Sequence, residues 1–151
     1  MSQSLAALYT HIVFSTKHRV PFLVDRTIRI QVFANLTAVS EKLNCPPLCV
    51  GGATDHVHLL VRLGRVISIS ECIKELKRAS SVSSKQLAPS LRDFGWQSGY
   101  GAFSVGRSEI EVVRRYIGDQ EDHHKVFTFK EEYIRLLEEN GIDWDERYVW
   151  D

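Results

Sequence analysis

The sequence contains few cysteines and no long apolar run. Its three cysteines, Cys45, Cys49 and Cys72, form neither an even set nor a Cys-x-x-Cys pair. This argues against a disulfide framework and favours reduced thiols in a cytoplasmic protein. No stretch approaches the roughly 18 apolar residues that a membrane span requires. Residues 1–8 lack a basic region followed by a long apolar run, so we expect neither secretion nor a membrane partner.

The chain also lacks a net charge, since 19 Lys and Arg balance 19 Asp and Glu. Neutrality by itself argues against a polyanionic partner. The charges are nevertheless unevenly distributed: residues 1–118 carry 15 Lys and Arg against 8 acidic residues, whereas residues 119–151 carry 4 against 11. The first part therefore has a net charge of +7 and could follow a phosphate backbone, although solvated helix faces would give the same tally.

The order of the expected elements indicates the fold class. β-branched and aromatic residues predict strands, and apolar residues recurring every three or four positions predict helices. The expected order is strand 8–15, helix 25–43, strand 48–53, strand 56–63, a helix from residue 68, and strand 96–105. This is the ferredoxin-like (RRM-like) order of an α+β fold, with a four-stranded antiparallel sheet and helices on one face.

The remaining residues complete a single domain over residues 1–151. We expect its core to span about 7–106, and a tyrosine-bearing helix with a C-terminal region to span about 107–151. Three capping boxes predict helix starts: Ser68 to Glu71, Ser108 to Glu111, and Thr128 to Glu131. The buried face of the second helix is predicted from Ile69, Ile73, Leu76 and Val82. The last ten residues, with Trp144, Tyr148 and Trp150, are expected to pack on the domain or on a partner subunit.

Two histidines mark the strand at 56–63. Side chains alternate along a strand, so His56 and His58 share one face and the apolar Val57 and Leu59 share the other. Two adjacent imidazoles preceded by Asp55 can hold a divalent metal if a third ligand comes from elsewhere. A His-x-His pair alone is equally compatible with two partly exposed histidines. For His11, in the first strand, we favour a structural role over one that lines the site.

The expected third helix carries a candidate nucleophile. Tyr116 and Gln120 are four residues apart and share a helix face, and His123 and His124 follow one turn later. The amide oxygen of Gln120 is a hard, neutral ligand that suits Mg²⁺ or Mn²⁺. A metal held by His56, His58 and Gln120 would polarise a phosphoryl oxygen. Tyr116 could then attack a phosphodiester in line and form a covalent phosphotyrosine.

Basic residues in three places are candidate contacts with a nucleic-acid backbone. They are Lys17 and Arg19 in an exposed turn, Lys74, Lys77 and Arg78 on the second helix, and Arg114 and Arg115 beside the tyrosine. Such residues are often only solvated. Trp96 could stack on a base, although a position in the core or at its rim is the favoured interpretation.

These motifs together resemble a known family. His56-Val57-His58 resembles the His-hydrophobic-His motif of HUH enzymes, and Tyr116 followed by Gln120 resembles the nucleophile helix of the single-tyrosine HUH transposases. Residues 96–105 are similar to the strand before that helix in the small insertion-sequence and REP-associated members, and the resemblance extends over residues 9–150. It implies a bacterial or archaeal enzyme that cleaves and rejoins single-stranded DNA near hairpins and leaves a 5′-phosphotyrosine and a free 3′-OH.

The resemblance further implies a homodimer formed through the sheet edge, in which Tyr116 and Gln120 of one subunit complete the metal site of the other. The family is often basic, whereas this chain is neutral with an acidic C-terminal region. Two alternatives therefore stay open. One is a hairpin-binding protein without catalytic activity, and the other is a hydrolase in which His56, His58, His123 and His124 hold zinc.

Overall fold

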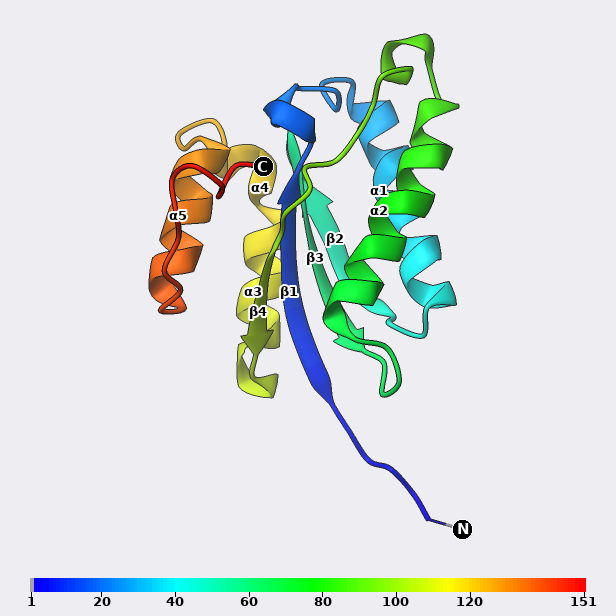
Figure 1. Cartoon of the computed structure of the whole chain (residues 1–151), viewed down its shortest axis with the longest axis vertical. Helices are drawn as coiled ribbons and strands as arrows, with labels where there is room; N and C mark the ends of the chain where they lie inside the picture. Colours follow the sequence, from blue (N-terminus) through cyan, green and yellow to red (C-terminus); the bar gives the residue numbers. More distant parts are fainter. Residues whose placement is uncertain (1) are drawn as a thin grey trace.

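The computed structural model describes residues 2–151, in which a sheet of four strands lies between two layers of helices (Figure 1). The strands are β1 (Leu8–Ser15), β2 (Pro47–Gly52), β3 (His56–Leu63) and β4 (Gly101–Val105). Their order across the sheet is β2-β3-β1-β4, and all neighbouring strands are antiparallel. The predicted ferredoxin-like α+β fold is confirmed.

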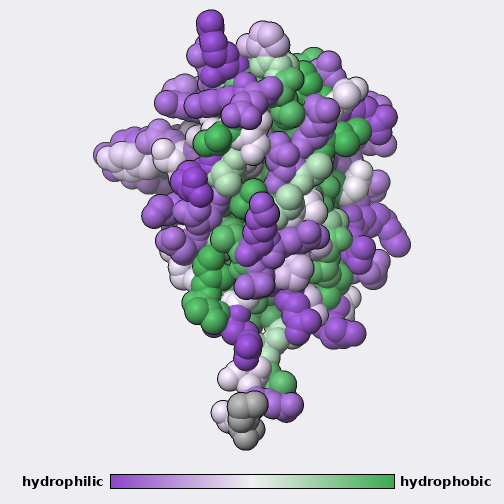
Figure 2. All heavy atoms as spheres, turned by 90° about the vertical axis from the view of Figure 1, so that its right-hand side faces the viewer, coloured by the Kyte–Doolittle hydropathy of each residue, from purple (hydrophilic) through white to green (hydrophobic). Residues whose placement is uncertain are grey.

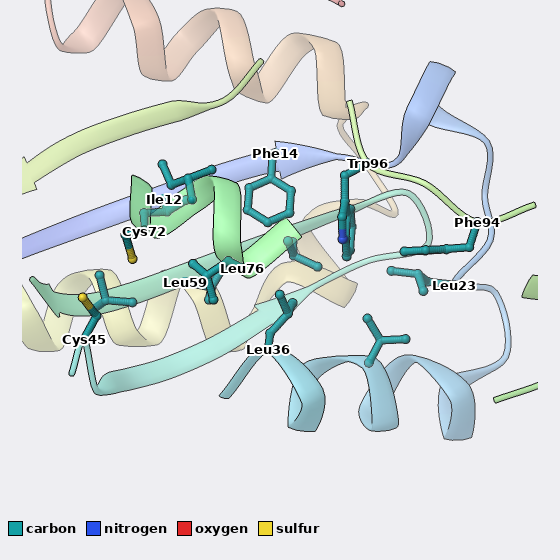
Figure 3. Packing of buried hydrophobic residues seen from close by; sticks show 14 of the residues in the cluster. Ile12, Phe14, Leu23, Leu36, Cys45, Leu59, Cys72, Leu76, Phe94 and Trp96 are labelled. Atoms are coloured by element: carbon teal, nitrogen blue, oxygen red, sulfur yellow. The ribbon is translucent and has the colours of Figure 1, made fainter. Parts of the chain in front are cut away.

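The first helical layer consists of α1 (Arg26–Lys42) and α2 (Ile69–Lys85). Both helices begin where the sequence places a capping residue, because Asp25 accepts from the amides of Thr27 and Ile28, and the Ser68 hydroxyl accepts from the amide of Glu71. Their apolar sides pack on one face of the sheet (Figure 3). The outer side of this layer is mainly hydrophilic, with apolar residues scattered among the polar ones (Figure 2).

The main core lies between this layer and the sheet. Alternate residues of the two central strands, such as Phe14 and Leu59, point into it and meet Leu36 and Leu76 from the helices (Figure 3). Trp96 belongs to the same core: its ring lies edge-on to Phe14, with centroids 4.9 Å apart. Of the two positions favoured for Trp96, core or rim, the structure has the core.

The second helical layer covers the opposite face of the sheet (Figure 1). It consists of α3 (Ile110–Gly118), the short α4 (Gln120–His123) and α5 (Phe129–Glu139). A smaller apolar cluster, including Val13, Phe103 and Tyr133, joins α5 to the sheet. Because both faces are covered, the polar face of β3 is buried rather than exposed to solvent.

Three local predictions are wrong. The last strand begins at Gly101 instead of residue 96, because the backbone before it bonds to a lysine side chain and to the chain end. Residues 107–109 form a short 3₁₀ turn, η3, and the Ser108 hydroxyl caps no helix. Val82 is 56% exposed, since the second half of α2 buries Ser80 and Ser84 instead. The hydroxyl of Ser80 accepts from the indole of Trp96 at 2.9 Å, which explains the polar residue there.

The C-terminal residues pack back on the same chain. The carbonyl oxygen of Asp151 accepts from the amide of Gly99 at 2.8 Å, and the ring of Trp150 lies edge-on to Tyr133 with centroids 6.1 Å apart. Two further short 3₁₀ turns are η1 (Lys17–Arg19) and η2 (Pro89–Leu91). Among residues 2–151, no helix has both the length and the apolar character needed to cross a membrane.

Candidate metal centre and nucleophile

The two strand histidines lie on the face of β3 that α3, α4 and α5 cover. Both side chains are fully buried, and they lie opposite Ser15 and Val13 of β1 in the sheet register. Residues directly opposite each other in an antiparallel pair point to the same face of the sheet, so Ser15 and Val13 of β1 lie beside the imidazoles. The shared orientation predicted from the His-x-His spacing is therefore what the structure has, and the alternative of partly exposed histidines is wrong.

Gly51 on β2 lets the tyrosine helix approach the sheet. A Cβ atom at this position would lie 2.6 Å from the carbonyl oxygen of Ile117 on α3, which is closer than any side chain allows. Gly51 pairs with His58 in the register. The close approach of α3 therefore occurs beside the histidines and brings the residues on either side of Ile117 to them.

Tyr116 and Gln120 both face the histidines, although α3 ends between them at Gly118. The side-chain oxygen of Gln120, Oε1, lies 2.9 Å from Nε2 of His56, and the side chain is buried. The Tyr116 ring lies edge-on to His58, with centroids 5.7 Å apart. Thus the predicted nucleophile and the three predicted metal ligands lie together within one chain, without a second subunit.

Glu132 on α5 is a central residue of this site that the sequence analysis missed. Its carboxylate is buried and accepts hydrogen bonds from the hydroxyl of Tyr116 and the amide nitrogen of Gln120. Its other oxygen lies 3.0 Å from Nε2 of His58. A signal was present in the pattern, because Glu132 takes the second place in the helical series Phe129, Glu132, Tyr133, Leu136, whose other members are apolar.

Two more side chains contact the strand histidines at their Nδ1 atoms, on the side of each ring away from Glu132. Nδ1 of His56 lies 2.8 Å from the carboxylate of Asp55, and Nδ1 of His58 lies 2.8 Å from Nε2 of His11. These contacts orient the rings so that both Nε2 atoms point toward α4 and α5, as in the outer shell of many metal sites. His11 therefore lies against the site through its contact with His58, so its position also fits the role of lining the site that the sequence analysis did not favour.

Burial and charge shift the pKa values of the two strand histidines in opposite directions. Burial alone would lower the pKa of His56, but hydrogen bonds from its ring to Asp55 and Glu132 raise it to about 9. Burial dominates at His58 and lowers its pKa to about 4. In the metal-free protein, His56 is therefore the imidazolium of this pair and His58 is neutral near pH 7.

The acidic and phenolic groups shift as well. Burial would raise the pKa of Glu132, but hydrogen bonds from His124, His56 and His58 outweigh it and hold that pKa well below its usual range. Burial and the adjacent charge of Glu132 raise the pKa of Tyr116. In the metal-free site, the ionised carboxylate of Glu132 therefore accepts a hydrogen bond from the hydroxyl of a neutral Tyr116.

The structure separates Lys77 from the other candidate DNA contacts. Its ammonium group donates to the backbone carbonyls of residues 97, 98 and 99, at distances of 2.8, 3.1 and 2.6 Å. An ammonium group has three protons, and all of them are used here. Lys77 therefore holds the chain before β4 in place, and its ammonium group has no proton left to donate to a phosphate.

Lys74 and Arg78 are exposed on α2, and α2 lies on the other side of the sheet from α3 and α5 (Figure 1). Arg78 pairs with Glu75 at 2.8 Å. The four other predicted contacts lie elsewhere: Lys17 and Arg19 are in η1, after β1, and Arg114 and Arg115 are on α3. Lys17, Arg114 and Arg115 are exposed, and the two arginines are on the helix that carries Tyr116.

Comparisons with known proteins point to one family. The family model described as "Transposase IS200 like" matches residues 4–120. A crystal structure of a candidate transposase from Deinococcus radiodurans R1 is similar with a TM-score of 0.61 and 22% identity, covering 80% of this chain and 98% of that chain. A REP-associated tyrosine transposase bound to a REP hairpin is similar with a TM-score of 0.56 and 14% identity, covering 82% and 74%. No curated protein matches the chain.

Proposed function

The chain belongs to the IS200-like transposase family, and from that premise we propose that it cleaves and rejoins single-stranded DNA at hairpin-bearing ends through a covalent bond to Tyr116. The observation that carries the proposal is the meeting of the Tyr116 hydroxyl, Gln120 and the two strand histidines in one buried cluster. A tyrosine whose hydroxyl already has a proton acceptor is suited to act as a nucleophile.

In the proposed reaction, the phenolic oxygen of Tyr116 attacks the phosphorus of a phosphodiester. A new bond joins this oxygen to phosphorus while the bond from phosphorus to the 3′ oxygen breaks. Glu132 orients the phenolic hydroxyl through its hydrogen bond, the phenolic proton passes to water, and the departing 3′ oxygen takes a proton from water. Rejoining is the reverse, in which a 3′-OH attacks the phosphotyrosine and releases Tyr116.

The donor groups fit a divalent metal such as Mg²⁺ or Mn²⁺. Two buried imidazoles, His56 and His58, and the amide oxygen of Gln120 would hold it. A bound metal withdraws negative charge from the phosphate that reacts. The chain itself orients the two imidazoles through contacts to their Nδ1 atoms. It also keeps both rings buried from water.

The proposed substrate is DNA with a hairpin beside a single-stranded segment. The similar REP-associated transposase is described as bound to a REP hairpin, and four basic residues, Lys17, Arg19, Arg114 and Arg115, are available near the strand and helix that carry the site. Lys74 and Arg78 would contact DNA only if it also reached the α2 side. We retain the predicted homodimer as part of the proposal, with each site built from a single chain.

The zinc hydrolase remains the second candidate, because His124 also reaches Glu132, at 3.0 Å. It predicts turnover with water and no protein–DNA bond. The hydroxyl of Tyr116 within the cluster and the family membership favour the transposase instead.

A covalent adduct would test the proposed function directly. Incubation with single-stranded hairpin DNAs and Mn²⁺ or Mg²⁺ should give a protein–DNA adduct on denaturing gels, with the added mass on Tyr116. Tyr116→Phe should form no adduct but should still bind DNA, because only the hydroxyl is lost. Tyr148→Phe, at an exposed tyrosine, is the matched control and should react normally. An adduct formed by Tyr116→Phe would exclude this nucleophile, and binding without an adduct in the wild-type protein would favour the inactive hairpin-binding protein.

A further inference from the structure

The carboxylate of Glu132 lies at a point where three imidazoles meet. Its Oε1 atom is 3.0 Å from Nε2 of His58, 3.0 Å from Nε2 of His124 and 3.4 Å from Nε2 of His56. One donor atom from each of these four residues lies within 4.8 Å of the others. In the described part of the chain, Glu132 is the single carboxylate among the buried residues. Burying a carboxylate is costly unless cations or metals balance it.

All three imidazoles are held in the same way. The far ring nitrogen, Nδ1, lies 2.8 Å from a fixed partner in each case: Asp55 for His56, His11 for His58, and the carbonyl oxygen of Phe127 for His124. The Nε2 atoms are thereby turned toward Glu132. Metal-binding histidines almost always have such a partner on the nitrogen that does not bind the metal. The shared arrangement therefore includes His124, which comes from a different element than the two strand histidines.

The second oxygen of Glu132 faces the nucleophile. Oε2 accepts from the hydroxyl of Tyr116 and from Nε2 of Gln120, the latter at 2.9 Å. Since the amide nitrogen of Gln120 is used in this way, its Oε1 atom is the one that faces the imidazole of His56. One carboxylate thus contacts the imidazole cluster through one oxygen and the tyrosine through the other.

We propose that Glu132 and His124 are ligands of the metal centre, and that Glu132 also positions the hydroxyl of Tyr116. The centre then has three imidazoles, one carboxylate and the amide oxygen of Gln120. Both added residues lie beyond residue 120, where the match to the family model ends. The positioning of Tyr116 for attack rests on the proposed function, whereas the ligand assignment rests on the geometry alone.

This donor set predicts which metals bind. Imidazole nitrogens favour Mn²⁺, Co²⁺ and Zn²⁺ over Mg²⁺, which prefers oxygen ligands and keeps its waters. A cavity of about 210 Å³, lined by His123, Phe127, Glu131, Glu132 and Arg135, gives the buried carboxylate an approach from outside. We expect Mn²⁺ or Co²⁺ to bind at least about 10-fold more tightly than Mg²⁺.

The test is a metal titration of the full-length, chelator-stripped protein without DNA. Calorimetry gives the affinity for Mn²⁺, and the visible absorption of bound Co²⁺ reports the ligands. Glu132→Gln and His124→Asn should each lower the Mn²⁺ affinity at least about 100-fold, more than the loss of an outer partner costs. Both should also change the Co²⁺ spectrum. Glu138→Gln, at an exposed acid on the same helix, is the matched control and should bind like the wild type.

Circular dichroism of each variant would show whether the fold is kept. If Glu132→Gln proves unfolded, His124→Asn carries the test, because this side chain lies at the edge of the site with 10% exposure. Wild-type affinity and an unchanged Co²⁺ spectrum in a folded variant would overturn the ligand assignment. If the folded variants lose metal affinity but the wild-type protein, which binds metal, forms no DNA adduct, the centre is supported and the proposed function is rejected, so the two failures are distinguishable.

Discussion

His56 and His58 are two residues apart on one strand face, yet their charges differ. The pKa of His56 is raised to about 9 because its ring lies between Asp55 and Glu132, whereas burial without a second acid lowers the pKa of His58 to about 4. Metals bind neutral imidazole. Loading of the site therefore requires His56 to lose a proton, and metal affinity depends on pH through this residue.

The same shift makes the stability of the metal-free protein depend on pH. The folded pKa of His56, about 9, exceeds the ordinary value of 6.5. Its contribution to the free energy of unfolding is therefore fully present below pH 6.5 and is lost as the pH rises through 9. In urea denaturation with a chelator present, the stability gap between wild-type protein and His56→Gln should shrink by about 2–3 kcal/mol from pH 6.5 to 9.5.

Other groups that titrate in this pH range contribute equally to the stability of the wild type and of His56→Gln, so their contributions cancel in the difference. Burial lowers the pKa of Lys77 to about 8, so this residue changes the stability of both proteins alike. A gap between wild type and His56→Gln that stays constant over the whole range would contradict a raised pKa for His56.

At the scale of elements, the contact between β2 and α3 determines where the nucleophile lies. A Cβ atom at Gly51 would be 2.6 Å from the carbonyl oxygen of Ile117 and 2.9 Å from its Cγ2 atom. Gly51→Ala must therefore push α3 away from the sheet. Because displacement of a reacting group by about 1 Å can cost roughly 100-fold in rate, we expect adduct formation by Gly51→Ala to slow at least about 10-fold.

Gly118→Ala is the control for this prediction, since a Cβ there meets no atom within 4 Å. It should form the adduct at the wild-type rate. Time courses of adduct formation, together with urea denaturation, separate a displaced helix from a general loss of stability. Equal rates for Gly51→Ala and wild type would show that α3 does not need this close approach.

Elements set by local pattern were predicted well, and those set by distant contacts were not. The start of α2 at Ser68 follows from its own capping residue. The start of β4 does not, because residues 97–99 are held by Lys77 from another element. Tyr116, Gln120 and the histidine pair follow from spacing and from the family resemblance. Glu132 does not, because a glutamate on an amphipathic helix is usually solvated, and only the packing of α5 on the sheet buries it.

In the molecule as a whole, one helical layer forms the main core and the other forms the site. The α1 and α2 layer forms the main core with the sheet, and the α3 to α5 layer closes over the histidines and supplies Tyr116, Gln120 and Glu132. Many of the acidic residues after position 118 are on α4 and α5 of this second layer, and one of them, Glu132, is the buried carboxylate of the site. The charge asymmetry of the chain thus partly reflects the site.

A site built from one chain predicts how two defective variants behave together. His58→Ala lacks a metal ligand and Tyr116→Phe lacks the nucleophile, so neither should cleave DNA alone. If Tyr116 served the histidines of a partner subunit, a mixed dimer would contain one intact site. In this structure Gln120 contacts His56 of the same chain at 2.9 Å, so every mixed site would carry a defect.

We therefore expect no adduct when the two variants are unfolded together, refolded and incubated with hairpin DNA and Mn²⁺. Refolded wild-type protein is the positive control, and a wild-type and Tyr116→Phe mixture shows that subunit exchange does not block reaction. Adduct formation by the two defective variants would mean that α3 crosses to a partner in solution. Its absence would leave each chain, whether alone or in a dimer, as a complete unit of catalysis.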